Sequence, residues 1–288
     1  MDTIKSLDEM ASALAARSQR GEKKRIGVIC PRDESTRNAV KMATEEGGFA
    51  EAVVFDDDDV SVAAAQAVAA AREEKVDILM KGTLNTDDLL RAVLNKETGI
   101  LPKGQVLTHL TCAQIPSYPK LVFCSDVAVI PYPTAEQREE QLKYLLQLMR
   151  SMGVEEPRVG LINCTEKVNE KHFPVTVEYR ALVAKAETGA FGRCIVDGPL
   201  DLKTCFSPEA LHKKGINSPL EGRADAIIFP DIQAGNVFYK TITCFCEGTE
   251  TAAILAGTQV PVVLPSRGDS PRNKYYSLAL ACLMSSQS

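Results

Sequence analysis

Short apolar runs alternate with longer helix-like segments along the first hundred residues of this chain. The runs at Arg25–Cys30, Glu51–Phe55 and Val76–Met80 have the character of strands, and Ser35–Glu46 and Ser61–Glu74 between them have that of helices. Strands that are apolar throughout are typical of a parallel sheet that is covered by helices on both faces. The alternation therefore predicts an α/β fold with a mostly parallel sheet.

A break in this alternation predicts two domains. Gln105–Cys112 and Leu121–Ser125 follow each other with no helix between them, and a proline-rich stretch comes next. A second series of strands and helices begins at Thr134–Met152, which opens with a capping-box pattern, and ends at the helix Pro271–Leu283. We place the junction between the domains near Val127–Pro133.

Composition excludes several classes of protein. The chain has 288 residues, 45% of them hydrophobic, which is enough for one large core or two medium ones. A net charge of −5 gives no reason to expect a nucleic-acid partner. There is no signal-peptide pattern and no apolar run of about 20 residues. The nine cysteines are scattered without disulfide or zinc spacing, so we expect buried, reduced thiols in a cytoplasmic protein.

The segment Pro261–Asn273 reads PVVLPSRGDSPRN and allows two interpretations. Its centre matches a cell-adhesion tripeptide, but the expected compartment does not suit that function. Alternatively, a strand delivers a polar loop to the start of a helix, with Ser270 as N-cap and Pro271 in the first helical position. We favour the second interpretation, because the preceding chain already predicts this type of strand–loop–helix unit.

The loop of this segment has the residues of an anion-binding site. Arg267 offers a forked cation, Ser266 a hydroxyl donor, and Gly268 allows a ligand to approach the backbone. Ligands of open α/β sheets bind beyond the carboxyl ends of strands, where helix N-termini favour negative charge. A solvated turn in which Arg267 pairs with Asp269 is the alternative, and the local sequence does not decide between the two.

Two further loops follow predicted strands and carry cations. Lys81, Gly82 and Thr83 form the first, which leads into a helix that carries Arg91. The second follows the run ADAIIF, and its candidate ligand contacts are Asp231, Gly235, Asn236 and Lys240. Loops of this composition are turns by default. Three loops with cations at strand ends nevertheless favour a shared cleft for an anionic ligand between the two domains.

Four stretches, in this order, resemble the phosphate acetyl/butyryl transferase family. They read LMKGTLNTDDLLRAVLNKETG, CIVDGPL, ADAIIFPDIQAGNVFYK and PVVLPSRGDSPRNKYYSLALA. The LRAVL stretch and the SR-x-DS loop are more similar to the phosphate butyryltransferase branch. The resemblance runs from about Ile26 to the last residue, so it covers nearly the whole chain.

The resemblance implies a reaction and a scaffold. The reaction is reversible transfer of a short-chain acyl group, butyryl or similar, from CoA to inorganic phosphate. The scaffold is that of isocitrate and isopropylmalate dehydrogenases, with two α/β/α domains and an active site in the cleft between them. Because the C-terminal segment returns to the first domain in this family, we expect domains at residues 1–126 plus 251–288 and at 127–250. A homodimer or larger assembly is also implied, with acyl-CoA and phosphate as substrates and no metal or prosthetic group.

The family also implies roles for individual residues. Arg267 would bind phosphate or the tetrahedral oxyanion, Ser266 would donate a hydrogen bond to it, and Arg91 would hold phosphate or acyl phosphate. The acetyltransferase branch carries a proposed Asp base in the first turn of the next helix, where this chain reads PRN. Three roles therefore stay open for Asp269, the nearest carboxylate: base towards the CoA thiol, orienting partner of Arg267, or helix cap.

Other functions stay open beside this one. A metal-dependent decarboxylating dehydrogenase would need clustered carboxylates and a nucleotide loop, but Asp197, Asp225 and Asp231 are scattered and no glycine-rich dinucleotide fingerprint is present. The acidic run at 56–59 has the character of a solvated loop. A phosphate acetyltransferase proper, or a non-catalytic relative that binds CoA or acyl phosphate, would share most of the motifs.

Overall fold

The computed structural model describes residues 3–21, 23–266 and 268–285 and has the expected mixed α/β composition. Its contacts divide the chain into two units. We call Met1–Ile4 with Thr108–Thr249 the middle unit, and Lys5–Leu107 with Glu250–Ser288 the split unit. We had expected a boundary at residue 126, and the division here falls between Leu107 and Thr108. The functional domain ranges stay a prediction.

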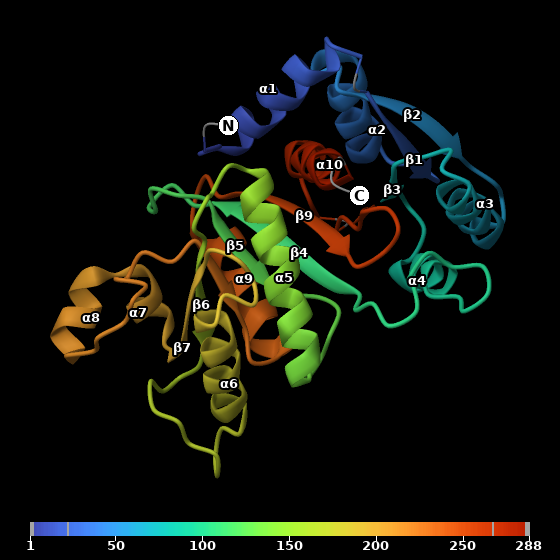
Figure 1. The fold of residues 1–288 in the computed structure, drawn as a ribbon. Coiled ribbons are helices and arrows are strands. Elements are labelled where there is room, and N and C mark those ends of the chain that lie inside the picture. The colour runs from blue at the N-terminus through green and yellow to red at the C-terminus, as the bar shows by residue number, and fades with distance from the viewer. Residues whose placement is uncertain (1–2, 22, 267, 286–288) are drawn as a thin grey trace. The chain divides into compact units, whose positions relative to one another are not determined.

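The split unit contributes five strands in the order β2-β1-β3-β10-β9 (Figure 1). Their bounds are β1 (Lys24–Ile29), β2 (Ala50–Phe55), β3 (Ile78–Lys81), β9 (Glu250–Ala256) and β10 (Val262–Val263). The pairs β2–β1, β1–β3 and β3–β10 are parallel, and β10–β9 is antiparallel. Every residue of β3 is buried, as its continuous apolar pattern predicted. The carboxyl ends of β1, β3 and β10 therefore meet at one edge of this part of the sheet.

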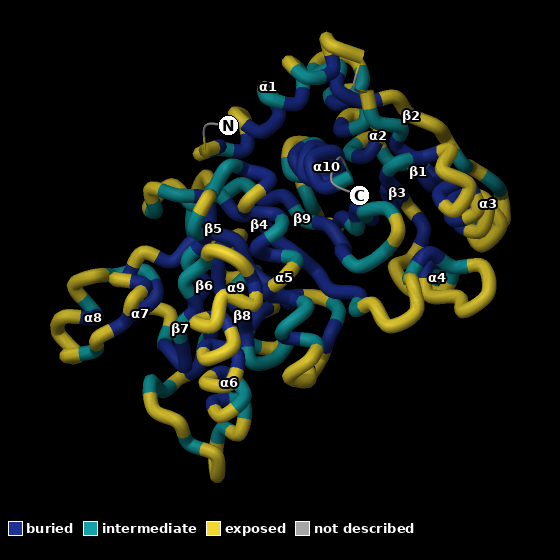
Figure 2. Tube along the Cα trace, in the orientation of Figure 1, coloured by how far each residue is buried: buried dark blue, intermediate teal, exposed yellow. Residues whose placement is uncertain are grey.

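Helix α10 (Pro271–Ser285) is the central core element of the split unit. Each residue from Tyr276 to Met284 is buried, and Figure 2 shows most of the helix in the colour of buried residues. It contacts β9, α2 and α1. The remaining helices of the unit are α1 (Leu7–Ser18), α2 (Glu34–Lys41), its π-helical extension η1 (Met42–Glu46), α3 (Val60–Arg72) and α4 (Thr86–Val93).

The middle unit contributes five strands in the order β4-β5-β8-β6-β7 (Figure 1). Their bounds are β4 (Thr108–Gln114), β5 (Val122–Ser125), β6 (Arg158–Ile162), β7 (Ile195–Leu200) and β8 (Ala226–Ile228). Only β4 runs antiparallel to its neighbour. The helices are α5 (Ala135–Ser151), α6 (Val175–Glu187), α7 (Leu202–Phe206), α8 (Pro208–Lys214) and α9 (Ile232–Phe245). The capping box predicted for α5 is present, formed by Thr134 and Gln137.

A buried carboxylate organises the middle unit at the carboxyl end of β5. Asp126 is 2% exposed. Its Oδ1 accepts the amide N–H groups of Ala128 and Val129 at 2.7 and 2.9 Å. Its Oδ2 accepts the Thr108 hydroxyl at 2.8 Å and two further amide N–H groups at 3.2 Å. Five donors thus compensate the burial of one negative charge.

The expectation of buried thiols holds only in part, because Cys164 and Cys244 are exposed. All nine are free, and five of them are buried. Burial raises the pKa of the Cys124 thiol to about 12, so this group stays protonated at neutral pH. None of the helices in the described part of the chain has the length and apolar character needed to cross a membrane.

Candidate anion-binding site

Two of the three predicted loops come together in the split unit, at the shared edge of β3 and β10. They line a cavity of about 360 Å³, which we call the lysine cavity. Its lining residues are Asp33, Lys81, Gly82, Thr83, Pro265, Ser266 and Lys274. The described lining side chains carry two ammonium groups against one carboxylate, so the cavity suits an anion.

A second cavity of about 490 Å³ shares part of this lining, and we call it the arginine cavity. It adds residues of α4, including Asp88 and Arg91, to Lys81 and Ser266. The Arg91 side chain is 77% exposed, and its Nη1 lies 3.6 Å from Asp88 Oδ1. Because the guanidinium is largely exposed and this ion pair is long, the pair costs little to separate, and the guanidinium is available to a ligand. Asn85 has the extended backbone expected of an N-cap, but its side chain makes no capping hydrogen bond.

The loop after β3 is fastened to the end of β1. The Gly82 amide donates to Ile29 O at 2.8 Å, and the Thr83 amide donates to Cys30 O at 2.9 Å. The Thr83 hydroxyl also donates to Cys30 O, at 3.1 Å. A Cβ on Gly82 would lie 2.2 Å from Cys30 O and 2.5 Å from Ile29 O. Glycine is therefore required here by close packing of two backbones.

Lys81 was predicted as a ligand-binding cation, and in the structure its ammonium group also stabilises the loop after β3. The residue is 4% exposed. Its Nζ donates to Gly82 O and Leu84 O, both at 3.2 Å, and thereby holds the loop that follows its own strand. A buried ammonium group needs such acceptors, because its charge is costly to remove from water.

The loop after β10 is held by its own side chains. Asp269 Oδ2 accepts the Ser266 amide at 2.7 Å, and the Asp269 amide donates to Ser266 O at 3.1 Å. Ser270 Oγ accepts the Asn273 amide at 3.1 Å, as expected of an N-cap to α10. Gly268 has open space where a Cβ would be. Arg267, the cation on which the sequence placed most weight, lies outside the described residues.

Two residues at this site were not found from the sequence. Lys274, in the first turns of α10, is 4% exposed, and its Nζ lies 3.2 Å from both Asp33 Oδ1 and Thr36 Oγ1. Asp33 is the N-cap of α2 and accepts the Thr36 amide at 2.8 Å. Burial acts to raise the pKa of the Asp33 carboxyl, but hydrogen bonds from Thr36 and Lys274 outweigh it and lower that pKa.

The residues predicted from the third loop lie in the middle unit and mostly have local contacts. A Cβ on Gly235 would lie 2.2 Å from Asp126 O, so helix α9 packs directly on that backbone. Asn236 Nδ2 donates to Val127 O at 3.1 Å. Lys240 is exposed, with its Nζ 5.3 Å from the centre of the Tyr239 ring. The predicted substrate role of these residues stays a prediction.

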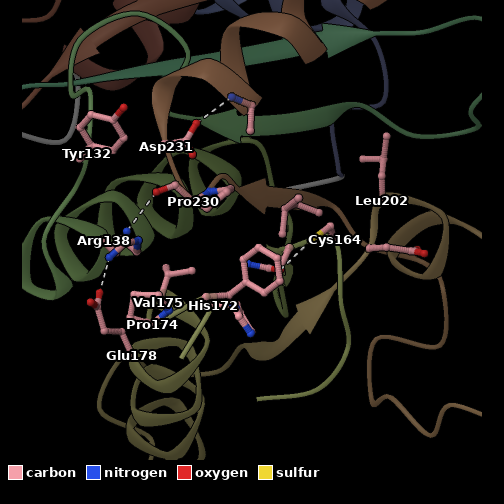
Figure 3. Close-up of a pocket in the computed structure, with 15 residues that line it drawn as sticks. Tyr132, Arg138, Cys164, His172, Pro174, Val175, Glu178, Leu202, Pro230 and Asp231 are labelled. Atoms are coloured by element: carbon pink, nitrogen blue, oxygen red, sulfur yellow. Dashed lines mark hydrogen bonds and ion pairs between the residues drawn. The ribbon is translucent and has the colours of Figure 1, made fainter. Parts of the chain in front are cut away.

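The fourth of these residues, Asp231, caps α9 through the Ala234 amide at 2.9 Å and lines a cavity of about 680 Å³ (Figure 3). Figure 3 shows Arg138 in its wall, donating to Pro230 O at 3.0 Å and paired with Glu178. Much of the remaining wall is apolar, from Ile162, Phe173, Pro174, Val175 and Leu202. Carboxylates beside apolar walls favour an uncharged ligand here over a phosphate group.

No group of three His, Cys, Asp or Glu side chains that could hold a metal ion occurs within residues 3–21, 23–266 and 268–285. The aspartates considered as metal ligands have other partners. Asp197 Oδ2 accepts the Ser218 hydroxyl at 2.6 Å, and Asp225 pairs with Lys120 at 2.6 Å.

Comparisons with known proteins relate this chain to one family. A family model described as "Phosphate acetyl/butaryl transferase" matches residues 18–282. The phosphate butyryltransferase of Clostridium acetobutylicum is 34% identical over 98% of each chain. The phosphate acetyltransferase of Thermotoga maritima is 38% identical over 75% of this chain and 73% of its own.

Solved structures show the same fold. A branched-chain phosphotransacylase from Enterococcus faecalis superposes with a TM-score of 0.81 and 26% identity, over 91% of this chain and 99% of that one. A phosphotransacetylase from Streptococcus pyogenes, 19% identical, superposes with a TM-score of 0.82 over 98% of this chain and all of that one. The second likeness concerns the fold alone.

Proposed function

Because the chain belongs to the phosphate acetyl/butyryl transferase family, we propose that it moves a short-chain acyl group, butyryl or similar, reversibly between coenzyme A and inorganic phosphate. The observation that carries this proposal is the lysine cavity. It gathers two buried ammonium groups, two hydroxyl groups and the start of α10 at one edge of the sheet. Such a group of donors suits a phosphate ion or acyl phosphate.

Phosphate binding is assigned to the loop after β10 and its neighbours. Ser266, which lines both cavities, donates its hydroxyl to the phosphate or to the oxyanion. Arg267 and Arg91 supply the guanidinium groups, and Gly82 with Thr83 forms the facing wall. For Asp269 the geometry supports the role of loop brace most strongly, since one carboxylate oxygen accepts the Ser266 amide.

The chemistry needs no covalent enzyme intermediate. A phosphate oxygen attacks the thioester carbonyl carbon, the C–O bond forms, and the carbonyl oxygen becomes an oxyanion. Collapse breaks the C–S bond and releases the CoA thiolate, which takes up a proton. The protein contributes by holding a dianion beside the carbonyl and by donating hydrogen bonds to the developing negative charge.

Other features are proposed on the family resemblance. They are a scaffold like that of isocitrate and isopropylmalate dehydrogenases, domains at 1–126 plus 251–288 and at 127–250, assembly as a homodimer or larger oligomer, and a cytoplasmic location. CoA and phosphate are substrates, and no further cofactor is proposed. Asp231, Gly235, Asn236 and Lys240 are proposed substrate contacts of the second domain, as are Gly268 and Ser270 of the first.

The test is phosphate-dependent release of CoA thiol from a panel of acyl-CoAs, from two to six carbons with branched members. We expect release only with phosphate, and fastest with four-carbon or branched chains. The substitution Arg267→Ala removes the guanidinium group and should reduce kcat by at least about 100-fold, which is the effect of losing one hydrogen-bond donor to the oxyanion. Arg193→Ala, which removes a surface ion pair with Glu156, is the matched control and should leave turnover unchanged.

The outcomes separate the alternatives. Fastest release with acetyl-CoA would identify an acetyltransferase proper. Binding of CoA without release from any member of the panel would identify a non-catalytic relative and overturn the proposal. Near-normal turnover in Arg267→Ala would remove the loop after β10 from the site.

A further inference from the structure

The position of Lys274 is unfavourable for a cation in two respects. The residue is 4% exposed, and transfer of an ammonium group out of water is costly unless its donors are satisfied. It also lies in the first turns of α10, where the helix dipole favours negative charge over positive charge. A residue kept in such a place has compensating partners, a ligand, or both.

The partners in the protein account for only part of the donor capacity of Lys274. An ammonium group has three N–H donors. One points to Asp33 Oδ1 and one to Thr36 Oγ1, each at 3.2 Å. Among the described residues the third has no acceptor, and Lys274 lines the lysine cavity together with Thr83 and Ser266.

The second buried lysine of the cavity differs in its acceptors. Lys81 donates to the backbone carbonyls Gly82 O and Leu84 O of the loop that it stabilises. Lys274 is held instead by side chains of the α2 N-terminus, which lies more than two hundred residues away along the chain. Its ammonium group is therefore placed by a separate element, which fixes its position in the cavity wall.

We propose that Lys274 is a further substrate-binding residue, which donates its third ammonium hydrogen to the phosphate group of inorganic phosphate or acyl phosphate in the lysine cavity. Asp33 and Thr36 are positioning residues, which hold the Lys274 ammonium group in place. This inference rests on the proposed function, because it concerns the same site. It adds one cation to the phosphate contacts, and Asp33 and Thr36 hold this cation in place in the absence of ligand.

The first experiment compares the wild type with Lys274→Met, which has a similar length but no charge and no donor. We expect KM for phosphate to rise about 10- to 100-fold, as for the loss of one hydrogen bond between charged groups. KM for acyl-CoA should stay within about 2-fold. Titration calorimetry with inorganic phosphate alone should show the same loss of affinity, which makes the result independent of turnover. Lys41→Met, on an exposed lysine of α2, is the matched control.

A double variant separates phosphate binding from charge balance. Lys274→Met leaves the Asp33 carboxylate without its cation, and that charge could itself repel phosphate. In Asp33→Asn/Lys274→Met this repulsion is gone. We expect phosphate affinity to stay low in the double variant. Should Lys274→Met not fold, Lys274→Gln keeps two donors for Asp33 and Thr36 and serves in the same comparison.

Two results would overturn the inference: unchanged phosphate affinity in Lys274→Met, or full recovery of affinity in the double variant. A wild type that releases no CoA thiol but binds phosphate would refute the proposed function, and the calorimetric comparison would still decide the role of Lys274. A CoA titration identifies the source of the phosphate group, because equal loss of CoA affinity would mean that Lys274 binds the phosphates of CoA. That result also overturns the inference.

Discussion

Adding a single methyl group at Gly82 should disrupt the wall of the lysine cavity. The new Cβ would lie 2.2 and 2.5 Å from two backbone carbonyl oxygens, Cys30 O and Ile29 O. Contacts between carbon and carbonyl oxygen in proteins lie at about 3.3 Å or more. Neither oxygen can turn away as a side chain would, because both belong to the backbone at the end of the buried strand β1.

The expected loss of stability follows from the contacts at this junction. Moving the loop away would break or lengthen three hydrogen bonds, from the Gly82 amide, the Thr83 amide and the Thr83 hydroxyl. Each contributes about 1 kcal/mol. Overpacking in a close-packed region costs about 1–3 kcal/mol by itself. These two costs are alternatives, because the loop either stays overpacked or moves and loses its hydrogen bonds. We therefore expect Gly82→Ala to reduce the free energy of unfolding by about 2–4 kcal/mol.

Differential scanning calorimetry measures this effect. At about 2–4 °C per kcal/mol for a unit of this size, the Tm of Gly82→Ala should fall by about 5–15 °C. Gly268→Ala is the matched control, because a Cβ there meets open space, and its Tm should change by less than about 2 °C. KM for phosphate should rise in Gly82→Ala, since the moved loop lines the cavity. A Tm equal to that of the wild type would show that the two backbones are not packed as described.

Three further predictions concern carboxylates. In urea unfolding, Asp126→Asn should lower the free energy of unfolding by about 2–4 kcal/mol, because the NH2 group of Asn would face backbone N–H groups whose hydrogen bonds a carboxylate oxygen now accepts. A change below about 0.5 kcal/mol would contradict this. Asp269→Asn should reduce kcat less than about 10-fold, since its amide oxygen can still accept the Ser266 amide, and a loss above about 100-fold would restore the base role. Burial acts to raise the pKa of the Asp77 carboxyl, but hydrogen bonds from Arg25 hold it below its ordinary value. This pair therefore stabilises the fold fully above about pH 4, and the difference in Tm between wild type and Asp77→Asn should shrink as pH falls from there through the lowered pKa of the folded state.

Local sequence signals predicted the elements that carry the site. Ser270 and Pro271 predicted the start of α10. In the structure Ser270 makes the N-cap hydrogen bond and Pro271 is the first helical residue. The apolar run that ends at Met80 predicted β3, which extends to Lys81. These signals are reliable because capping and strand burial depend on neighbouring residues.

The partners that complete the site could not be predicted in this way. Asp33 and Lys274 are 241 residues apart and meet only because β1 and β10 both flank β3 in the sheet. Lys81 has the sequence context of a ligand-binding cation, yet carbonyl acceptors in its own loop surround its ammonium group. The contact between Asp33 and Lys274 has no local sequence pattern, because it depends on which strands become neighbours. The Lys81 contacts are local, but they depend on how the loop folds back onto the end of its own strand.

The route of the chain through the split unit also has a consequence for protein synthesis. The unit is assembled from Lys5–Leu107 and Glu250–Ser288, and its strand β10 and helix α10 are synthesised after the whole middle unit. Until then β3 lacks its second neighbour, and the apolar residues that α10 covers have no partner. Residues Lys5–Leu107 therefore stay incompletely folded until the whole middle unit has been synthesised. An unpaired strand edge and uncovered apolar surface over that interval are the features that chaperones bind and that lead to aggregation.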